Sequence, residues 1–435
     1  MINVNTVRCD FSCWGSALLM AIALTTSGTV AAAESVSTSV DAAREHAIKV
    51  LESTILFDGH NDLPMVVRRQ EDAPGDVLAY DLRRRTSGDT DIERLRAGRL
   101  GAQFWSVYIP GEGRGPFARP QLEQIELALR IIERYPDVLA LATTAADVRR
   151  AKENGQIASL LGMEGGYGIE NSLDALRAYH RLGVRYMALT HNAHTDWADA
   201  AAQIPPRHNG LTAFGEEVVR EMNRLGMIID LSHAAPATMA DTLRITEAPV
   251  MFSHSSARGV CDVPRNVPDD ILREMPKNGG IVMVTFVAGF INCEVGRVME
   301  PAMTELSLRA RAASSDSERR QIMREGMAAI EVPPTTIGMV ADHIEYVRAL
   351  AGVDHVGIGG DFDGNPRWPE GLSDVSMYPN LFAELVRRGW SDEDLRKLAG
   401  ENMLRVMEQV EQVAAKLQTE RAPSTALFVP AQAKE

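Results

Sequence analysis

The chain has 435 residues, of which 45% are hydrophobic and 24% are charged. These ordinary globular values exclude a disordered chain, a collagen-like chain and a small disulfide-dense protein. The formal net charge of −14 argues against a nucleic-acid partner, which would need a basic patch, and no run reaches the ~18 apolar residues of a transmembrane span.

The N-terminus carries an apolar run from Trp14 to Leu24, followed by small residues that end at Ala33. This pattern predicts a secretory signal peptide over residues 1–33, cleaved near Ala33. The protein is therefore expected to be exported, to the periplasm or the medium. A leader retained as an anchor, or a buried helix, is the alternative.

Of the four cysteines, Cys9 and Cys13 lie in the predicted leader, and Cys261 and Cys293 lie in the mature chain. An oxidising compartment would permit a disulfide between the latter two. Their spacing is equally compatible with two free buried thiols.

Eight short apolar or β-branched runs alternate with helical patterns along the chain. The expected strands are 55–58, 102–109, 157–163, 186–190, 227–231, 250–253, 280–287 and 356–359. Helical patterns cover 122–135, 213–225, 268–275 and 337–350. Strands that alternate with helices indicate a parallel sheet, and eight of them predict an α/β fold of the closed (β/α)8 TIM-barrel type. An open doubly wound sheet is the alternative.

The domain organisation follows from the same pattern. Residues 34–417 are expected to form one barrel domain. The charged, helix-prone stretch 294–334 is too long for a simple connection and predicts a helical insertion between the seventh and eighth strands. The tail 418–435 is rich in Ala, Pro, Ser and Thr and is expected to be flexible.

Ionisable residues follow six of the eight expected strands. Because the carboxyl ends of barrel strands meet at one mouth, these side chains are expected to converge there. They are Asp58, His60, Asp62, Glu164, His191, His233, His254, Asp361 and Asp363. Each placement alone is weak, but their coincidence predicts a functional site.

Imidazole and carboxylate groups are the usual ligands of catalytic zinc. His60 and Asp62 are two residues apart and point the same way on an extended chain. Glu164 has two oxygens with which to bridge two ions, and His233 and His254 can complete the second. Two ions about 3.5–4 Å apart would share a water and lower its pKa toward ~7, which supplies hydroxide at neutral pH.

The other histidines lack this placement. His46, His180 and His343 fall in helical patterns and are expected on the surface or in helix packing, and His355 precedes the last strand. His194 and His208 lie in a loop near the expected mouth, where either could contact a substrate. The sequence has no G-x-S-x-G elbow, P-loop, G-x-G-x-x-G after a strand, or CxxC pattern.

The ordered motifs of the chain resemble those of the membrane dipeptidase (renal dipeptidase) family of dinuclear zinc peptidases. The matching segments span nearly all of the mature chain. They are DGHNDLP (58–64), EGG (164–166), LTHN (189–192), GLTAFG (210–215), DLSH (230–233), FSHSSAR (252–258), RNVPDD (265–270) and GGDFDG (359–364).

The resemblance implies two zinc ions per chain, one bound by His60 and Asp62 and one by His233 and His254, with Glu164 bridging them. Mn or Co stays an alternative to zinc. It also implies that Cys261 and Cys293 pair as a disulfide. Members of the family often form homodimers, so a homodimer is an expectation for this chain.

The resemblance further implies that His191, Arg265 and Asp361 contact the substrate. His191 could donate to the developing oxyanion, and Arg265 offers a planar fork for the terminal carboxylate. Asp361 could move protons or hold the free amine, and Glu164 acts through the metal-bridging hydroxide.

The implied activity is hydrolysis of free dipeptides, including those with a D residue at the C-terminus and dehydro-dipeptides. An amidohydrolase acting on N-acyl amino acids, lactones or cyclic amides is the alternative function. A non-catalytic zinc or peptide binder is a more remote one.

Overall fold

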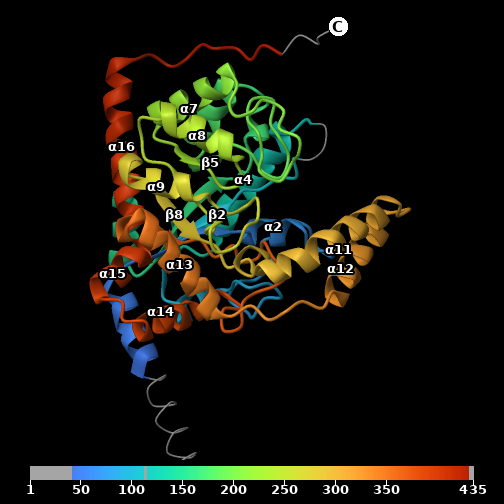
Figure 1. Cartoon of the computed structure of the whole chain (residues 1–435), viewed down its shortest axis with the longest axis vertical. Coiled ribbons are helices and arrows are strands. Elements are labelled where there is room, and N and C mark those ends of the chain that lie inside the picture. The colour runs from blue at the N-terminus through green and yellow to red at the C-terminus, as the bar shows by residue number, and fades with distance from the viewer. Residues whose placement is uncertain (1–41, 112–114, 431–435) are drawn as a thin grey trace, which may run out of the picture.

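The computed structural model of the chain describes residues 42–111 and 115–430 (Figure 1). The predicted signal peptide, residues 1–33, lies outside the described residues and stays a prediction. The described part begins with a helix over residues 42–53 that leads into the first strand.

Eight parallel strands form a closed ring, so the predicted barrel is confirmed and the open sheet is wrong. Each strand pairs with the next, β9 pairs with β1, and β2 pairs directly with β4. The strands are β1 (Leu56–Asn61), β2 (Leu100–Ser106), β4 (Ile157–Met163), β5 (Val184–Ala188), β6 (Ile228–Asp230), β7 (Met251–Phe252), β8 (Ile281–Val284) and β9 (Val356–Ile358). They match the eight expected runs within a few residues at each end.

One strand was not predicted from the sequence. β3 (Leu139–Leu141) pairs with the first residues of β4, Ile157 to Ser159, and β5 takes over that edge of β4 from Leu161 onward. β3 therefore extends the edge of the sheet without adding a ninth strand to the ring.

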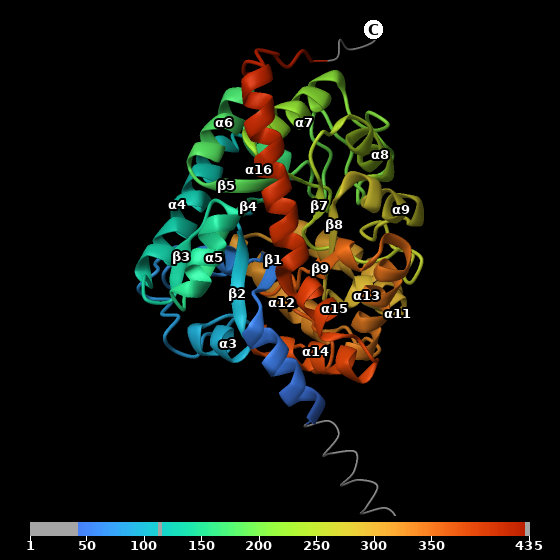
Figure 2. The same cartoon turned by 90° about the vertical axis from the view of Figure 1, so that its left-hand side faces the viewer.

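Helices surround the ring of strands (Figure 2). The longer ones are α4 (Ala118–Arg134), α5 (Ala145–Glu153), α6 (Leu173–Arg181), α7 (Ala213–Leu225), α8 (Pro236–Ile245), α9 (Asp269–Asn278), α13 (Ile337–Ala351) and α14 (Tyr378–Arg387). Shorter pieces are α2 (Leu63–Arg68), α3 (Ile92–Ala97), α10 (Ala288–Ile291), α15 (Asp392–Arg396), a π-helical turn at Lys397–Glu401, and 3₁₀ turns at Gly166–Ile169, Val353–His355 and Val375–Met377.

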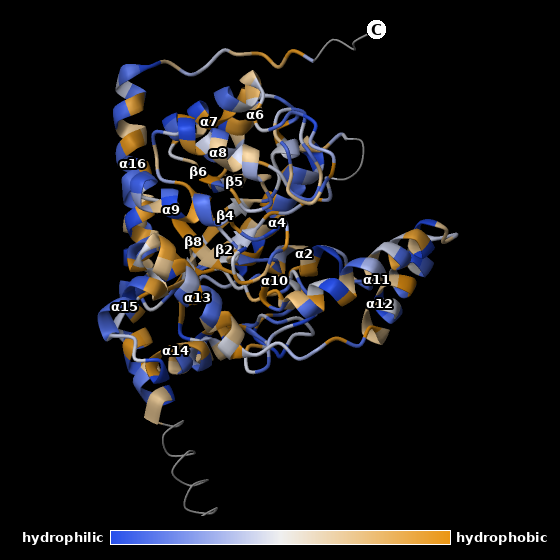
Figure 3. Cartoon of the chain, viewed as in Figure 1, coloured by the Kyte–Doolittle hydropathy of each residue, from blue (hydrophilic) through white to orange (hydrophobic). Residues whose placement is uncertain are grey.

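Local sequence explains where several helices begin and end. Ser172 accepts the Ala175 amide and caps the start of α6. Gly226 adopts a left-handed conformation, φ 78°, and ends α7, whose bounds match the predicted 213–225. The strands are largely apolar, whereas the outer helices carry both apolar and polar residues (Figure 3).

The predicted helical insertion is confirmed. It consists of α11 (Cys293–Arg311) and α12 (Asp316–Ala329), which pack side by side and project from the barrel between β8 and β9 (Figure 1).

The last long helix, α16 (Asn402–Glu420), closes the amino-terminal end of the barrel. Its Met403, Val406 and Met407 are buried in one cluster with Ile55 and Phe57 at the start of β1. The opposite end of the barrel is therefore the end that remains for a substrate. Figure 2 shows α16 running across the strands.

Beyond α16, residues 421–430 lie along α7. The backbone amide of Ser424 donates to Glu221 at 3.2 Å, and the ring centroids of Phe428 and Phe214 are 5.5 Å apart. The flexibility expected for 418–435 stays a prediction. None of the described helices is long and apolar enough to cross a membrane.

Candidate metal centre

The ionisable residues that follow the strands converge at the carboxyl end of the barrel. They line one cavity of about 300 Å³, whose walls include Asp62, Glu164, His191, His233, His254, Arg265, Asp361 and Asp363. His60 lies fully buried, within 4 Å of three carboxylates of this group. The convergence expected from the strand ends is therefore present.

Glu164, at the end of β4, directs its two oxygens toward different histidines. Its Oε2 lies 3.5 Å from Nε2 of His60. Its Oε1 lies 3.0 Å from Nε2 of His233 and 3.5 Å from Nε2 of His254. Such a carboxylate has the arrangement needed to join two ligand sets.

The first set surrounds His60. Its Nε2 lies 3.4 Å from Asp62 and 3.9 Å from Asp361, while its Nδ1 lies 2.8 Å from the hydroxyl of Tyr186. Nε2 of His60 and Oδ1 of Asp62 are buried and have no hydrogen-bond partner in the described part of the chain. Buried polar atoms without partners are costly, and a metal ion would satisfy both.

The second set contains His233 and His254, whose Nε2 atoms lie 2.9 Å apart. Nδ1 of His254 lies 2.8 Å from the hydroxyl of Ser253, which donates to Asp230 at 2.6 Å. This outer chain orients the ring so that Nε2 points into the cavity, as outer-shell partners of metal-binding histidines do.

Within residues 42–111 and 115–430, three groups of side chains bring possible ligand atoms within 4.8 Å of one another. They are His60 with Glu164 and His254; Glu164 with His191 and His233; and His60 with Asp62 and Asp361. The donor set of imidazoles and carboxylates, together with the orphaned buried atoms, fits a divalent metal.

Burial and charge affect the three histidines of this cluster in opposite directions. Burial lowers the pKa of His233 and of His254 well below the usual value, so both rings are neutral and able to bind metal. At His60 burial opposes protonation, yet Tyr186, Glu164 and Asp62 hold its pKa well above the usual value. The surroundings of His60 thus favour a positive charge, which a metal ion can supply.

The backbone is unusual at three of these residues. His233 has φ 68°, and Asp361 and Asp363 each have φ 65°, in the left-handed region that non-glycine residues rarely adopt. Gly364 closes the turn after Asp361, and a Cβ there would collide with the carboxylates of Asp62 and Asp361. Local strain therefore accompanies the placement of the cluster.

Arg265 lies at the cavity wall and is only 6% exposed. Burial lowers its pKa to about 10, although Asp361, Glu164 and Asp230 oppose this. Among the described residues no carboxylate lies within ion-pair distance of its guanidinium, and its Nε has no hydrogen-bond partner. The group is a buried cation with room for an anionic partner.

His191 also lines the cavity, with Nε2 3.7 Å from Glu164 and its ring 4.8 Å from that of Tyr108. His194 and His208 do not line it. His194 accepts the Ala200 amide at 2.9 Å, and His208 lies 3.1 Å from the Thr195 carbonyl, so both organise their own loop.

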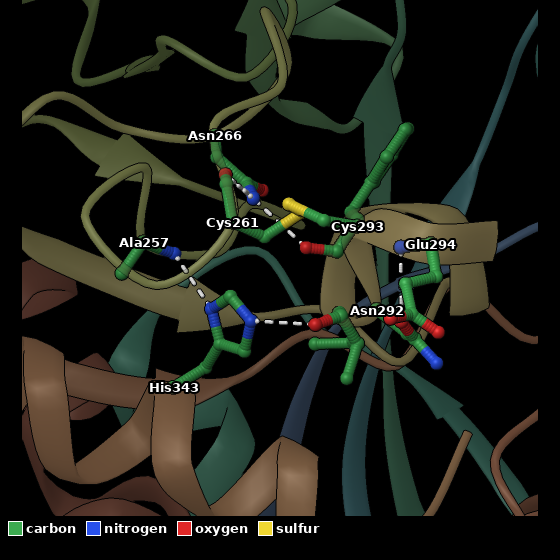
Figure 4. The surroundings of a disulfide bond; sticks show 9 residues. Ala257, Cys261, Asn266, Asn292, Cys293, Glu294 and His343 are labelled. Carbon is green, nitrogen blue, oxygen red and sulfur yellow. Dashed lines mark hydrogen bonds between the residues drawn. A yellow bond between two sulfur atoms is a disulfide. The ribbon is translucent and has the colours of Figure 1, made fainter. Parts of the chain in front are cut away.

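The disulfide between Cys261 and Cys293 is present (Figure 4). It joins the loop after β7 to the start of α11.

His343 is not a surface residue: it is fully buried and lies between Ala257 and Ile291.

Sequence reasoning missed the residues that support the candidate ligands. Tyr186 stands in an expected strand, where a polar tip on an inward-facing aromatic ring could have marked it. Ser253 immediately precedes His254, but adjacency did not reveal its bond to Asp230, which lies on another strand.

Comparisons with known proteins agree with this geometry. A model of the membrane dipeptidase family, peptidase family M19, matches residues 44–421. Dipeptidase 3 of mouse and of rat are each 42% identical over 380 residues, covering 86% of this chain and 68% of theirs.

Solved structures are similar in fold. The probable dipeptidase PvdM of Pseudomonas aeruginosa has a TM-score of 0.73 at 24% identity, covering 86% of this chain and 100% of that one. A metallo peptidase of Rhodobacter sphaeroides, solved with a phosphinate mimic of the dipeptide L-Ala-D-Ala, has a TM-score of 0.67 at 25% identity, covering 82% and 99%. The chain therefore belongs to the membrane dipeptidase family of metallopeptidases, peptidase family M19.

Proposed function

We propose that the protein is a zinc-dependent dipeptidase that hydrolyses free dipeptides at the cavity above Glu164. The observation that carries this proposal is the buried guanidinium of Arg265, which has no carboxylate partner among the described residues and lies on the wall of the same cavity as the candidate ligand cluster. A buried cation beside a metal site suits a substrate that presents its terminal carboxylate next to the bond to be cut.

Two metal ions are proposed. His60 and Asp62 would hold one ion, His233 and His254 would hold the other, and Glu164 would supply an oxygen to each. The opposed directions of the two Glu164 oxygens support this division. When bound, the ions supply Lewis acidity that polarises a carbonyl and lowers the pKa of water.

The side chains of the chain itself bind and orient the dipeptide. Arg265 holds the carboxylate with its fork, and His191 donates a hydrogen bond to the oxygen that becomes negative as the carbonyl is attacked. Burial raises the pKa of Asp361 well above its usual range, which suits a carboxyl group that exchanges protons with the peptide nitrogen or the free amine.

A D residue at the C-terminal position is included in the proposed substrate range. The Rhodobacter sphaeroides structure holds a mimic of L-Ala-D-Ala, which supports this extension. An exported location, a homodimer and zinc as the native metal also belong to the proposal. The first rests on residues 1–33, and the other two rest on the family resemblance.

The test is hydrolysis of L-Ala-L-Ala and L-Ala-D-Ala by the mature protein, before and after a chelator, with zinc then returned. The proposal expects chelator-sensitive cleavage that zinc restores. N-acetylated dipeptides serve as the contrast and should be cleaved poorly. Cleavage of the N-acetylated compounds by folded, zinc-loaded protein, with none of the free dipeptides, would show that another amidohydrolase reaction is the true activity.

A further inference from the structure

The guanidinium of Arg265 is weakly held by its own hydrogen bonds. It donates to the hydroxyl of Ser255 at 3.4 Å and to the carbonyl of His254 at 3.3 Å. Both distances exceed the 2.7–3.2 Å that is usual for N–H···O bonds. The side chain therefore depends on its packing and on its backbone for its position.

The packing comes from Phe290 on α10. The guanidinium carbon lies 5.1 Å from the centre of the Phe290 ring, within the range of a cation–π contact. Phe290 lines the cavity and is half-buried, so its ring forms one wall beside Arg265. The contact is stronger for a desolvated cation such as this one.

The backbone is held by the residue that follows Arg265. The side-chain amide of Asn266 is fully buried and donates two hydrogen bonds, each 2.8 Å long, to the carbonyls of Cys261 and Phe290. Asn266 therefore links the loop that carries Arg265 to the helix that carries Phe290.

Two further ties join the same segments (Figure 4). The Cys261–Cys293 disulfide connects the loop covalently to the start of α11, just beyond the end of α10. His343 accepts the Ala257 amide through Nδ1 at 3.1 Å, and its Nε2 lies 3.1 Å from the carbonyl of Ile291. Asn266, the disulfide and His343 thus connect the loop after β7 to helix α10 and the residues that follow it.

We infer that Asn266 and Phe290 are positioning residues for the substrate carboxylate, because they fix the Arg265 fork where the carboxylate must meet it. The inference rests on the proposed role of Arg265 in a dipeptidase. Asn266 acts through the backbone and Phe290 acts through the face of the guanidinium. Their loss is expected to weaken recognition of the carboxylate while the metal ligands stay in place.

The test compares a dipeptide with the same dipeptide carrying a C-terminal amide. The ratio of their kcat/KM values measures recognition of the carboxylate, since contacts with the substrate side chains cancel. Phe290→Leu and Asn266→Ala should each lower this ratio about 10-fold, through a higher KM for the free acid. Phe290→Tyr keeps the ring and should retain the ratio.

The chain offers a matched control. Asn402 is also buried and donates from its side-chain amide to two carbonyls, of Val353 at 2.7 Å and of Val356 at 2.9 Å, but it lies at the start of α16. Asn402→Ala removes the same kind of bonds and should leave the ratio unchanged. If Asn266→Ala does not fold, Phe290→Leu, at a half-buried position, still tests whether recognition of the carboxylate depends on the position of Arg265.

A double variant distinguishes the loss of Arg265 positioning from a general disturbance of the cavity. In an Arg265→Met background the ratio should already be lost, and Phe290→Leu should lower it no further. Suppose that the wild-type enzyme prefers the free acid and that folded Phe290→Leu shows the same ratio of kcat/KM values. This result would overturn the inference about Phe290 and leave the proposed role of Arg265 intact. A wild-type enzyme that shows no preference for the free acid would instead overturn the proposed role of Arg265.

Discussion

The hydroxyl of Tyr186 lies 2.8 Å from Nδ1 of His60, beneath the cavity and fully buried. Burial raises the pKa of Tyr186, so its hydroxyl stays protonated. When Nε2 of His60 binds a metal ion, the ring proton resides on Nδ1 and is donated to the phenol oxygen. The tyrosine thereby fixes the tautomer and orientation of a proposed ligand from another strand.

Tyr186→Phe should therefore weaken metal binding while the chain still folds. Loss of an outer-shell partner typically costs about 10–100-fold in metal affinity. Metal content after dialysis against a graded series of chelator concentrations measures this cost. Tyr179→Phe removes another buried hydroxyl, which donates to the Gly168 carbonyl at 2.9 Å, and should leave metal affinity unchanged. Equal metal affinity in Tyr186→Phe and wild type would contradict the expectation.

Glu164→Gln keeps the shape of the proposed bridging residue but removes its charge. It should lose more metal affinity than the roughly 10–100-fold cost of an outer-shell change, and activity should fall with it. Metal analysis and dipeptide kinetics on the purified protein measure both effects. Glu221→Gln, at a buried glutamate paired with Arg224 and Arg177, is the control and should keep its metal. A metal-replete, fully active Glu164→Gln enzyme would refute the bridging role.

Arg265→Lys keeps a positive charge but removes the planar fork. A charge-assisted hydrogen bond contributes about 1.5–3 kcal/mol, so kcat/KM for free dipeptides should fall about 10–100-fold, mainly through KM. Steady-state kinetics on one free dipeptide suffices. Wild-type KM in this variant would mean that the carboxylate binds elsewhere.

The burial of His343 leads us to expect that the stability of the protein depends on pH. Burial lowers its pKa to about 4 in the folded protein, against 6.5 for the free side chain. Between these values the unfolded chain binds a proton that the folded chain does not, so the free energy of unfolding decreases as pH falls from 6.5 toward 4. The contribution of this one group is about 3 kcal/mol.

His343→Gln should flatten that dependence, while lowering stability near pH 7 through the loss of two hydrogen bonds. Denaturant unfolding at several pH values between 4 and 7 measures both effects, and the difference from wild type cancels the other histidines. His46→Gln, at a half-exposed site on the first helix, is the control. If the free energy of unfolding of His343→Gln changed with pH in parallel with that of wild type, His343 would not be the group responsible for the pH dependence.

The sequence alone determined the barrel and the identity of the candidate site. Strand runs such as 157–163 are apolar because both faces of a barrel strand are buried, and that pattern is local. His60, Glu164 and His254 could be grouped because the fold brings every strand's carboxyl end to one mouth. Periodicity and topology therefore carried the prediction as far as the ligand set, while family resemblance supplied the pairing of Cys261 with Cys293.

Only the tertiary structure decided the supports of that site. The local sequence does not show that Tyr186 contacts His60, 126 residues away, or that His343 lies between Ala257 and Ile291. β3 was missed because its Leu-Ala-Leu sequence contains no β-branched residue and only its first residue is fully buried. Whether two side chains form a hydrogen bond depends on their positions to within a few tenths of an ångström. The packing of the whole barrel sets those positions. A one-dimensional pattern encodes which face is buried, but not which buried groups meet.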